Sequence, residues 1–214
     1  EKTNQYLKEL VIEKMVRSDI PMAFEDVNIS LLSTLAEIFM RDPGMILDMT
    51  LLSKELGIHK LTLSKHISFL EFGNLIRVVK NFRPSVRAES RKQKKVYPYN
   101  AALSFCFYPK LSEGGEGKVF ENLVCSALSI SKYWRKGEKE VDFLKLNNGD
   151  ILPIEVKYKK TIGKNDIKNL VYFMKKNKLS NGVVVYSGEE KILSMDDKSI
   201  VLFPIHKLLF NFSL

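Results

Sequence analysis

Residues 140–157 read EVDFLKLNNGDILPIEVK, and this stretch decides the fold of the second half of the chain. Two short runs of alternating apolar and polar residues flank Asn148-Gly149, a dipeptide typical of a tight β-hairpin turn. The sequence therefore predicts two antiparallel strands, near 140–146 and 151–158.

The second strand carries an acid and a base on one face. Glu155 and Lys157 are two residues apart, so both point to the same side, while Ile154 and Val156 point toward a core. Charges on a mostly apolar strand are costly unless something pairs them. A divalent cation held by the carboxylates of Asp142 and Glu155 would do so, because Mg²⁺ prefers oxygen ligands. Pairing of Glu140 with Lys157 in a structural ion network is the alternative.

An acid on one strand followed by Glu-x-Lys on the next resembles the PD-(D/E)xK nuclease superfamily. That superfamily usually adds a glutamate on the preceding helix, and Glu121 in GKVFENLV (117–124) matches it. Together with YWRK (133–136), EVDF (140–143) and IEVKY (154–158), the order is similar to the C-terminal domain of unknown function found behind archaeal and bacterial AAA+ ATPase modules. The sequence departs from the superfamily at Val141, where a proline would precede the aspartate.

The resemblance implies a metal-dependent nuclease that hydrolyses phosphodiesters. Asp142 and Glu155 would bind Mg²⁺ or Mn²⁺, and Glu121 would complete the metal shell. Lys157 would position the attacking water. ATP would be bound only by an AAA+ module preceding this chain. The alternative is a catalytically inactive nuclease-like fold that serves the ATPase as a regulatory module binding DNA or a partner, and a structural assembly module is a third interpretation.

The first half of the chain contains a helix-turn-helix pattern. Residues 49–72 read as two helices joined at Gly57, with Thr50 as the expected N-cap of the first. With strands near 75–79 and 94–99, the region 28–98 resembles a winged helix. In such a module the early polar residues of the later helix meet DNA; here these are His59, Lys60, Thr62, Ser64 and Lys65. That helix offers no Arg, Asn or Gln for bidentate base contacts, so we expect phosphate-dominated binding; a protein-joining role is the alternative.

Positive charge is concentrated in one segment. The chain has a net charge of +9, and residues 80–95, the basic segment, hold seven cations against Glu89 alone. This distribution favours a nucleic-acid partner, most simply DNA. The residues expected to contact it are Arg83, Arg87, Arg91, Lys92, Lys94 and Lys95.

The predicted organisation is α/β: an α+β winged helix-turn-helix followed by a restriction-endonuclease-like α/β domain. We expect residues 1–27 to link to a preceding ATPase module through a helix that spans about 3–17 and ends before Pro21. Residues 28–98 would form the winged helix-turn-helix, and 99–214 the nuclease-like domain.

Composition excludes several other classes. No stretch approaches the ~20 apolar residues of a membrane span, and no secretory signal opens the chain. Cys106 and Cys125 lack metal or redox spacing, which indicates free thiols in a reducing cytoplasm. Three scattered histidines form no catalytic or metal-ligand set. The strand form of the nucleic acid and self-association stay open.

Overall fold

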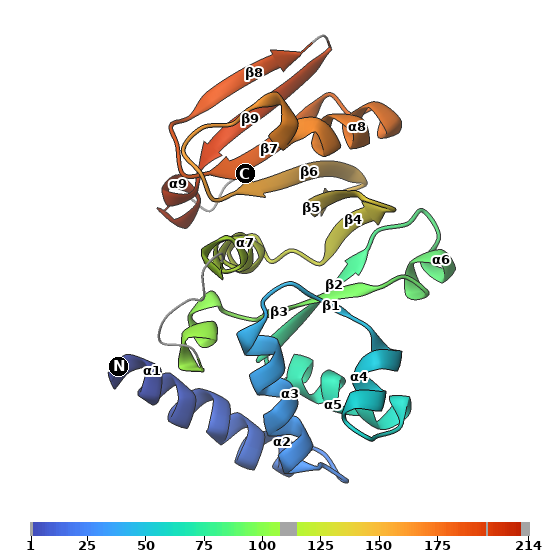
Figure 1. Cartoon of the computed structure of the whole chain (residues 1–214), viewed down its shortest axis with the longest axis vertical. Helices are drawn as coiled ribbons and strands as arrows, with labels where there is room; N and C mark the ends of the chain where they lie inside the picture. The colour runs from blue at the N-terminus through green and yellow to red at the C-terminus, as the bar shows by residue number, and fades with distance from the viewer. Residues whose placement is uncertain (1, 108–114, 196, 211–214) are drawn as a thin grey trace. The chain divides into compact units, whose positions relative to one another are not determined.

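The computed structural model describes residues 2–107, 115–195 and 197–210. They form a mixed α/β structure with two compact units (Figure 1). The first unit comprises Glu1–Val78 and Gln93–Asn122, and the second comprises Val79–Lys92 and Leu123–Leu214. The expected domain boundaries at 27/28 and 98/99 do not coincide with limits of these units and stay predictions.

The N-terminal helix is longer than predicted. It runs through α1 (Lys2–Leu7), the π-helical turns η1 (Lys8–Glu13) and η2 (Met15–Asp19), and α2 (Ile20–Ala23). Pro21 was expected to follow the helix end, and that prediction was wrong. The proline falls in the first turn of α2, where its missing N–H is tolerated. The chain becomes extended only at Phe24.

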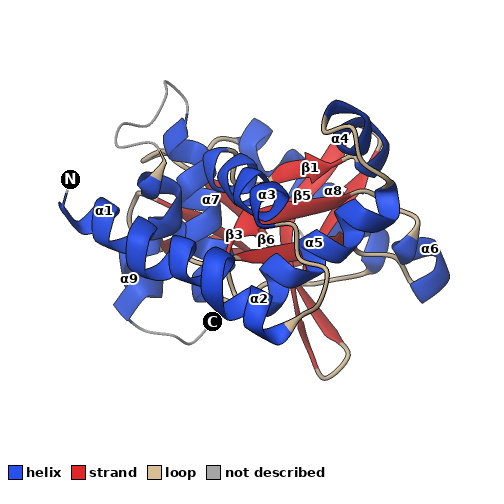
Figure 2. Cartoon of the chain, turned by 90° about the horizontal axis from the view of Figure 1, so that it is seen from below, coloured by secondary structure: helices blue, strands red, loops and turns tan. Residues whose placement is uncertain are grey.

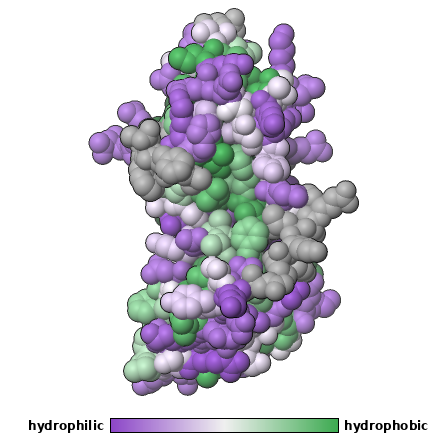
Figure 3. All heavy atoms as spheres, turned by 90° about the vertical axis from the view of Figure 1, so that its left-hand side faces the viewer, coloured by the Kyte–Doolittle hydropathy of each residue, from purple (hydrophilic) through white to green (hydrophobic). Residues whose placement is uncertain are grey.

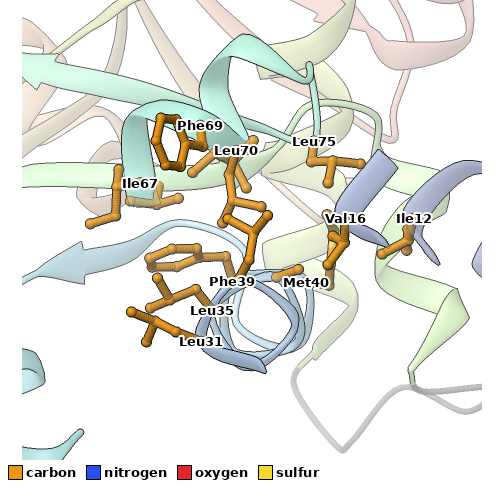
Figure 4. Close-up of a cluster of buried hydrophobic side chains, with 14 of the residues drawn as sticks. Ile12, Val16, Leu31, Leu35, Phe39, Met40, Ile67, Phe69, Leu70 and Leu75 are labelled. Carbon is orange, nitrogen blue, oxygen red and sulfur yellow. The ribbon is translucent and has the colours of Figure 1, made fainter. Parts of the chain in front are cut away.

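This helix contributes to the core of the first unit. Ile12 and Val16 are buried in one cluster with Leu35 and Phe39 of α3 (Ile29–Arg41) and Leu70 of α5 (Lys60–Phe72), as Figure 4 shows. Helices α3 and α5 lie side by side (Figures 1 and 2). Helix α3 therefore presents a core face to this unit.

The ends of the helices in this unit are set by side-chain caps and turns. Asn28 caps α3, and Asp48 caps α4 (Met49–Glu55) by accepting hydrogen bonds from the backbone N–H groups of Thr50 and Leu51 at 2.9 Å each. Thr50 was predicted as this cap and instead lies inside the first turn. Gly57 has φ +64°, which confirms the expected tight turn before α5.

Short strands follow in the first unit. β1 (Met45–Leu47) pairs antiparallel with β3 (Lys94–Pro98), placing Ile46 opposite Lys95. β2 (Ile76–Asn81) begins in this unit and ends in the second. The 3₁₀ helix η3 (Ala101–Cys106) and most of α7 (Gly115–Ala127) complete the first unit.

The second unit is built on a mixed sheet in the order β2-β4-β5-β6-β7-β9-β8. Its strands are β4 (Lys132–Lys136), β5 (Lys139–Asn147), β6 (Asp150–Lys157), β7 (Asn181–Tyr186), β8 (Lys191–Met195) and β9 (Lys198–Pro204). The predicted β5–β6 hairpin is confirmed, with positive φ at Asn148 and Gly149 as a type I′ turn requires.

Three helical segments belong to this sheet, and a fourth lies in the basic segment. The 3₁₀ turn η4 (Lys164–Ile167) and α8 (Lys168–Asn177) connect β6 to the parallel β7, and α9 (Ile205–Phe210) follows β9. Leu170, Phe173 and Met174 of α8 lie in one buried cluster with Val184 of β7. Helix α8 lies against the sheet (Figure 1). In the basic segment, α6 (Val86–Ser90) occupies what was predicted as a loop.

Charged and polar side chains cover much of the face seen in Figure 3. Within the described part of the chain, no helix combines the length and apolar character needed to cross a bilayer.

Candidate functional site

Asp142 lies where the β5–β6 ladder stops. The last paired residues on this side are Phe143 and Ile154, so Asp142 and Glu155 come next on the two strands. Asp142 Oδ2 accepts a hydrogen bond from the backbone N–H of Val156 at 2.7 Å. A side-chain carboxylate is therefore bound to the backbone of the neighbouring strand, which fixes its position beside Glu155.

Glu155 and Lys157 form an ion pair on one face of β6. Lys157 Nζ lies 2.6 Å from Glu155 Oε1, and the two side chains are 25% and 6% exposed. Glu155 pairs in register with Val184 of β7, a residue of the core under α8. Ile154 and Val156 are also buried, as the predicted alternation requires. Two charges thus sit in a largely apolar surrounding and are held there by each other.

Lys157 is strongly biased toward its charged form. Burial lowers its pKa, but the negative charges of Asp142 and Glu155, the hydrogen bond to Glu155 and the charge of Asp166 together raise the pKa above its usual value. The ammonium therefore persists through the neutral range. Asp142, Glu155 and Lys157 consequently behave as one electrostatic cluster in the second unit.

Asp166 belongs to the same surroundings and was not anticipated from the sequence. It forms an ion pair with Lys159 and accepts the backbone N–H of Gly163 at 2.8 Å. Hydrogen bonds from Lys159 and Gly163 lower its pKa, so it stays ionised. The sequence signal for this residue is Gly163-x-x-Asp166 at the start of a helix. In such a pattern the carboxylate can accept a hydrogen bond from the backbone N–H three residues earlier.

The carboxylate oxygens of this cluster are the type of ligand that binds a hard divalent cation. Asp142 and Glu155 supply carboxylate oxygens, which Mg²⁺ and Mn²⁺ prefer. Among the described residues, no group of three Asp, Glu, His or Cys side chains stands ready as a complete ligand set. Two protein carboxylates are compatible with Mg²⁺, since that ion usually keeps several waters.

Glu121, expected as the third acid, has close partners in the first unit. Its Oε1 lies 3.1 Å from Lys95 Nζ and also accepts a hydrogen bond from the Tyr97 hydroxyl. Lys95 is buried, so its expected role as a surface contact to nucleic acid is wrong: β3 points this side chain toward Glu121. Tyr97 is fully buried, and no pattern in the sequence indicates its role. Both partners of Glu121, Lys95 and Tyr97, lie more than twenty residues before it, so no local pattern connects them.

Most of the other residues expected to meet nucleic acid are on the surface. On α5 and its N-cap, His59, Lys60, Ser64 and Lys65 are exposed and Thr62 is half-buried. His66 of α5 is buried: its Nε2 accepts the backbone N–H of Asn28 at 3.0 Å and its Nδ1 contacts the Thr62 carbonyl at 2.8 Å.

The basic segment divides into surface and structural residues. Arg87, Arg91 and Lys92 are exposed, while Lys94 is half-buried. Arg83 donates to three neutral oxygens, those of Asn81, Phe82 and Arg135. Glu89, the single acid of the segment, pairs with Lys132 of β4. Glu89 is therefore engaged with β4 and does not neutralise the exposed cations of the basic segment.

Glu140 forms an ion pair with Arg135, the residue opposite it on β4, at 3.6 Å. The expected pairing of Glu140 with Lys157 is not seen, because Lys157 pairs with Glu155 instead.

Comparison with known sequences now gives the family. Residues 1–109 match a family described as "Domain of unknown function (DUF8612)". The chain belongs to this family. Residues 116–208 match "Domain of unknown function (DUF4143)", a domain found in AAA-ATPase-associated proteins, which confirms the expected domain of unknown function in the second half. The DUF8612 match covers the first unit's long N-terminal helix as well as its helix-turn-helix pattern.

Other comparisons add little. No curated protein matches the sequence. The crystal structure of protein VC1899 from Vibrio cholerae is similar at 14% identity with a TM-score of 0.30, over 97% of this chain and 53% of that one. The chain thus spans about half the length of that protein.

Proposed function

We propose that this chain is the nucleic-acid-binding region of a protein that also carries an AAA+ ATPase module, and that its second unit hydrolyses phosphodiesters with a divalent cation. The observation that carries the proposal is the cluster of Asp142, Glu155 and Lys157 at the end of the β5–β6 ladder. Perturbed, partly buried charges gathered at one point are typical of reactive sites.

Each residue of the cluster has a separate role. Asp142 and Glu155 supply the carboxylate oxygens that would hold Mg²⁺ or Mn²⁺. When bound, such an ion lowers the pKa of a coordinated water and neutralises charge on a phosphate. Lys157 is held protonated by its two acidic neighbours, so it acts as a positive charge toward phosphate oxygens and as a hydrogen-bond donor that orients water. It does not act as a general base at neutral pH.

DNA binding is assigned to the exposed cations of both units. His59, Lys60, Ser64 and Lys65 on or beside α5, and Arg87, Arg91 and Lys92 in the basic segment, are accessible for phosphate contacts. The polar character of the helix surface favours backbone contacts over base recognition.

A second candidate function is supported by the surroundings of Glu121. Lys95 and Tyr97 already engage this carboxylate, which the nuclease resemblance had assigned to the metal shell. The chain would then be a catalytically inactive module that binds DNA or a partner and regulates the ATPase.

A nuclease assay separates the two functions. Labelled duplex and single-stranded DNA are incubated with the chain, alone and with its ATPase region restored, in Mg²⁺, Mn²⁺ or EDTA. Asp142→Asn keeps an oxygen for the Val156 N–H but removes the charge, so cleavage should fall at least ~100-fold while DNA binding persists. Asp150→Asn is the matched control, because Asp150 is an exposed acid on the same hairpin.

The outcome decides between catalysis and regulation. Lys157→Ala should slow cleavage without abolishing metal binding. If the wild-type protein shows no metal-dependent cleavage even with its ATPase region, the regulatory function takes the place of the catalytic one. If Asp142→Asn cleaves as fast as Asp150→Asn, the activity belongs to another site.

A further inference from the structure

The second unit contains a pocket formed by the start of the basic segment, β4 and α8. Its volume is about 220 Å³, and its walls include the side chains of Phe82, Arg83, Trp134, Lys136, Phe173 and Lys176. All of these residues lie in one compact unit, so the pocket is a feature of that unit alone. None of them belongs to the Asp142–Glu155–Lys157 cluster.

Aromatic rings form the inner part of this pocket. Trp134 and Phe173 are buried, with ring centroids 5.1 Å apart, and the half-buried Phe82 continues the apolar wall. Hydrogen bonding of the Phe82 N–H to the Tyr133 carbonyl at 2.7 Å fixes Phe82 beside β4. The wall is therefore a rigid, sheet-supported aromatic surface.

Cations form the outer part. Lys136 and Lys176 are exposed, and Lys176 Nζ lies 5.5 Å from the centroid of the Trp134 ring. Arg83 is held in place by three neutral oxygens, of Asn81, Phe82 and Arg135. Within the ranges that the structure describes, none of these three cations has a carboxylate partner. Three positive charges around one aromatic pocket favour an anionic ligand with a flat apolar part.

We infer that this pocket binds one unpaired nucleotide of a nucleic-acid strand, with its base against the half-buried Phe82 and near the buried Trp134, and its flanking phosphates on Lys136 and Lys176. Proteins that bind single strands combine aromatic stacking surfaces with positive charge in this way. The inference rests on the proposed function, because it names a further site for the same nucleic-acid partner.

Size and position favour a strand over a free ligand. Pockets for drug-sized molecules are usually about 300–1,000 Å³, so this smaller pocket accepts a single ring system and leaves the rest of the ligand outside. The outside is where the basic segment continues, with Arg87, Arg91 and Lys92 exposed in the same unit. A strand would gain from these charges, whereas a single nucleotide would not reach them.

Trp134 provides a direct probe, because it is the one tryptophan in the sequence. The full chain is titrated in EDTA with oligo(dT), with dTMP and with a blunt duplex, while tryptophan fluorescence is followed. Labelled oligo(dT) anisotropy is measured in parallel. We expect oligo(dT) to quench Trp134 and to bind at least about tenfold more tightly than dTMP, since it adds phosphate contacts.

The double variant Lys136→Ala/Lys176→Ala tests the phosphate contacts. We expect its affinity for oligo(dT) to fall about tenfold, as expected for lost charge-assisted hydrogen bonds. The slope of log affinity against log salt should shrink by about 1.4, at ~0.7 per phosphate contact on a single strand. Lys2→Ala/Lys14→Ala removes the same charge from exposed positions outside the pocket and should retain wild-type affinity.

Three results would overturn the inference: no tryptophan quenching by oligo(dT), equal loss of affinity in the two double variants, or equal affinity for dTMP and oligo(dT). The test is independent of the proposed catalysis, because it uses EDTA. Quenching that depends on Lys136 and Lys176 supports the pocket even if the protein cleaves nothing. Metal-dependent cleavage without such quenching leaves the proposed function standing and removes the pocket.

Discussion

Glu121→Gln separates a structural from a catalytic role for this carboxylate. The substitution keeps the size of the side chain and an acceptor for the Tyr97 hydroxyl, but it removes the negative charge 3.1 Å from Lys95 Nζ. Removing one partner of a buried ion pair lowers the free energy of unfolding by about 3–5 kcal/mol. The Glu121 side chain is 22% exposed and that of Lys95 only 7%, so we expect the lower end, about 3 kcal/mol. For a chain of this size that corresponds to a melting temperature lower by about 6–12 °C.

The measurement is thermal and urea unfolding of three variants beside the wild type. Glu116→Gln is the matched control, since Glu116 is an exposed glutamate in the first turn of the same helix and should cost about 0.5 kcal/mol. Glu121→Gln/Lys95→Met should recover much of the loss, because both charges are then removed. If Glu121→Gln unfolds like the wild type yet abolishes metal-dependent cleavage, the ion-pair reasoning is refuted and Glu121 is catalytic.

Two further predictions concern stability. The pKa of Lys157 is raised in the native state, so its pairing stabilises the native state fully below the unfolded-state pKa of about 10.4 and less as pH rises through the native pKa. The difference in urea midpoint between wild type and Lys157→Met should therefore narrow only at strongly alkaline pH. A difference that narrows already between neutral pH and pH 9 would contradict this. His66→Phe should lower the free energy of unfolding by about 1–3 kcal/mol, because the Asn28 N–H loses its acceptor. His59→Ala, at an exposed position, is the control and should change that free energy by no more than about 0.5 kcal/mol. Equal unfolding midpoints for the two variants would show that the hydrogen bond is dispensable.

Local signals in the sequence were sufficient for most elements. The β5–β6 hairpin follows from Asn148-Gly149 and the alternation around it, and the turn between α4 and α5 follows from Gly57. The cap of α4 was misplaced by two residues because Asp48 and Thr50 are both good caps, and only the backbone geometry selects Asp48.

Nonlocal contacts were the part that the sequence could not supply. The spacing of Glu155 and Lys157 correctly predicted a shared face, because strand parity is a local property. The partners of Glu121 could not be found this way, since they lie on another element. β8 was missed because its five residues alternate weakly and carry no turn signal as distinctive as Asn-Gly.

β8 has a consequence for the behaviour of the protein at high concentration. It ends the strand order of the described sheet, so one row of its backbone N–H and C=O groups lies at an open edge, and Ile192 on it is 67% exposed. Such edges are templates for strand addition by another chain and so for aggregation. The strand is short and begins with Lys191, two features by which natural sheets discourage that pairing. Replacing this lysine with an apolar residue would weaken that protection and make the purified protein harder to concentrate.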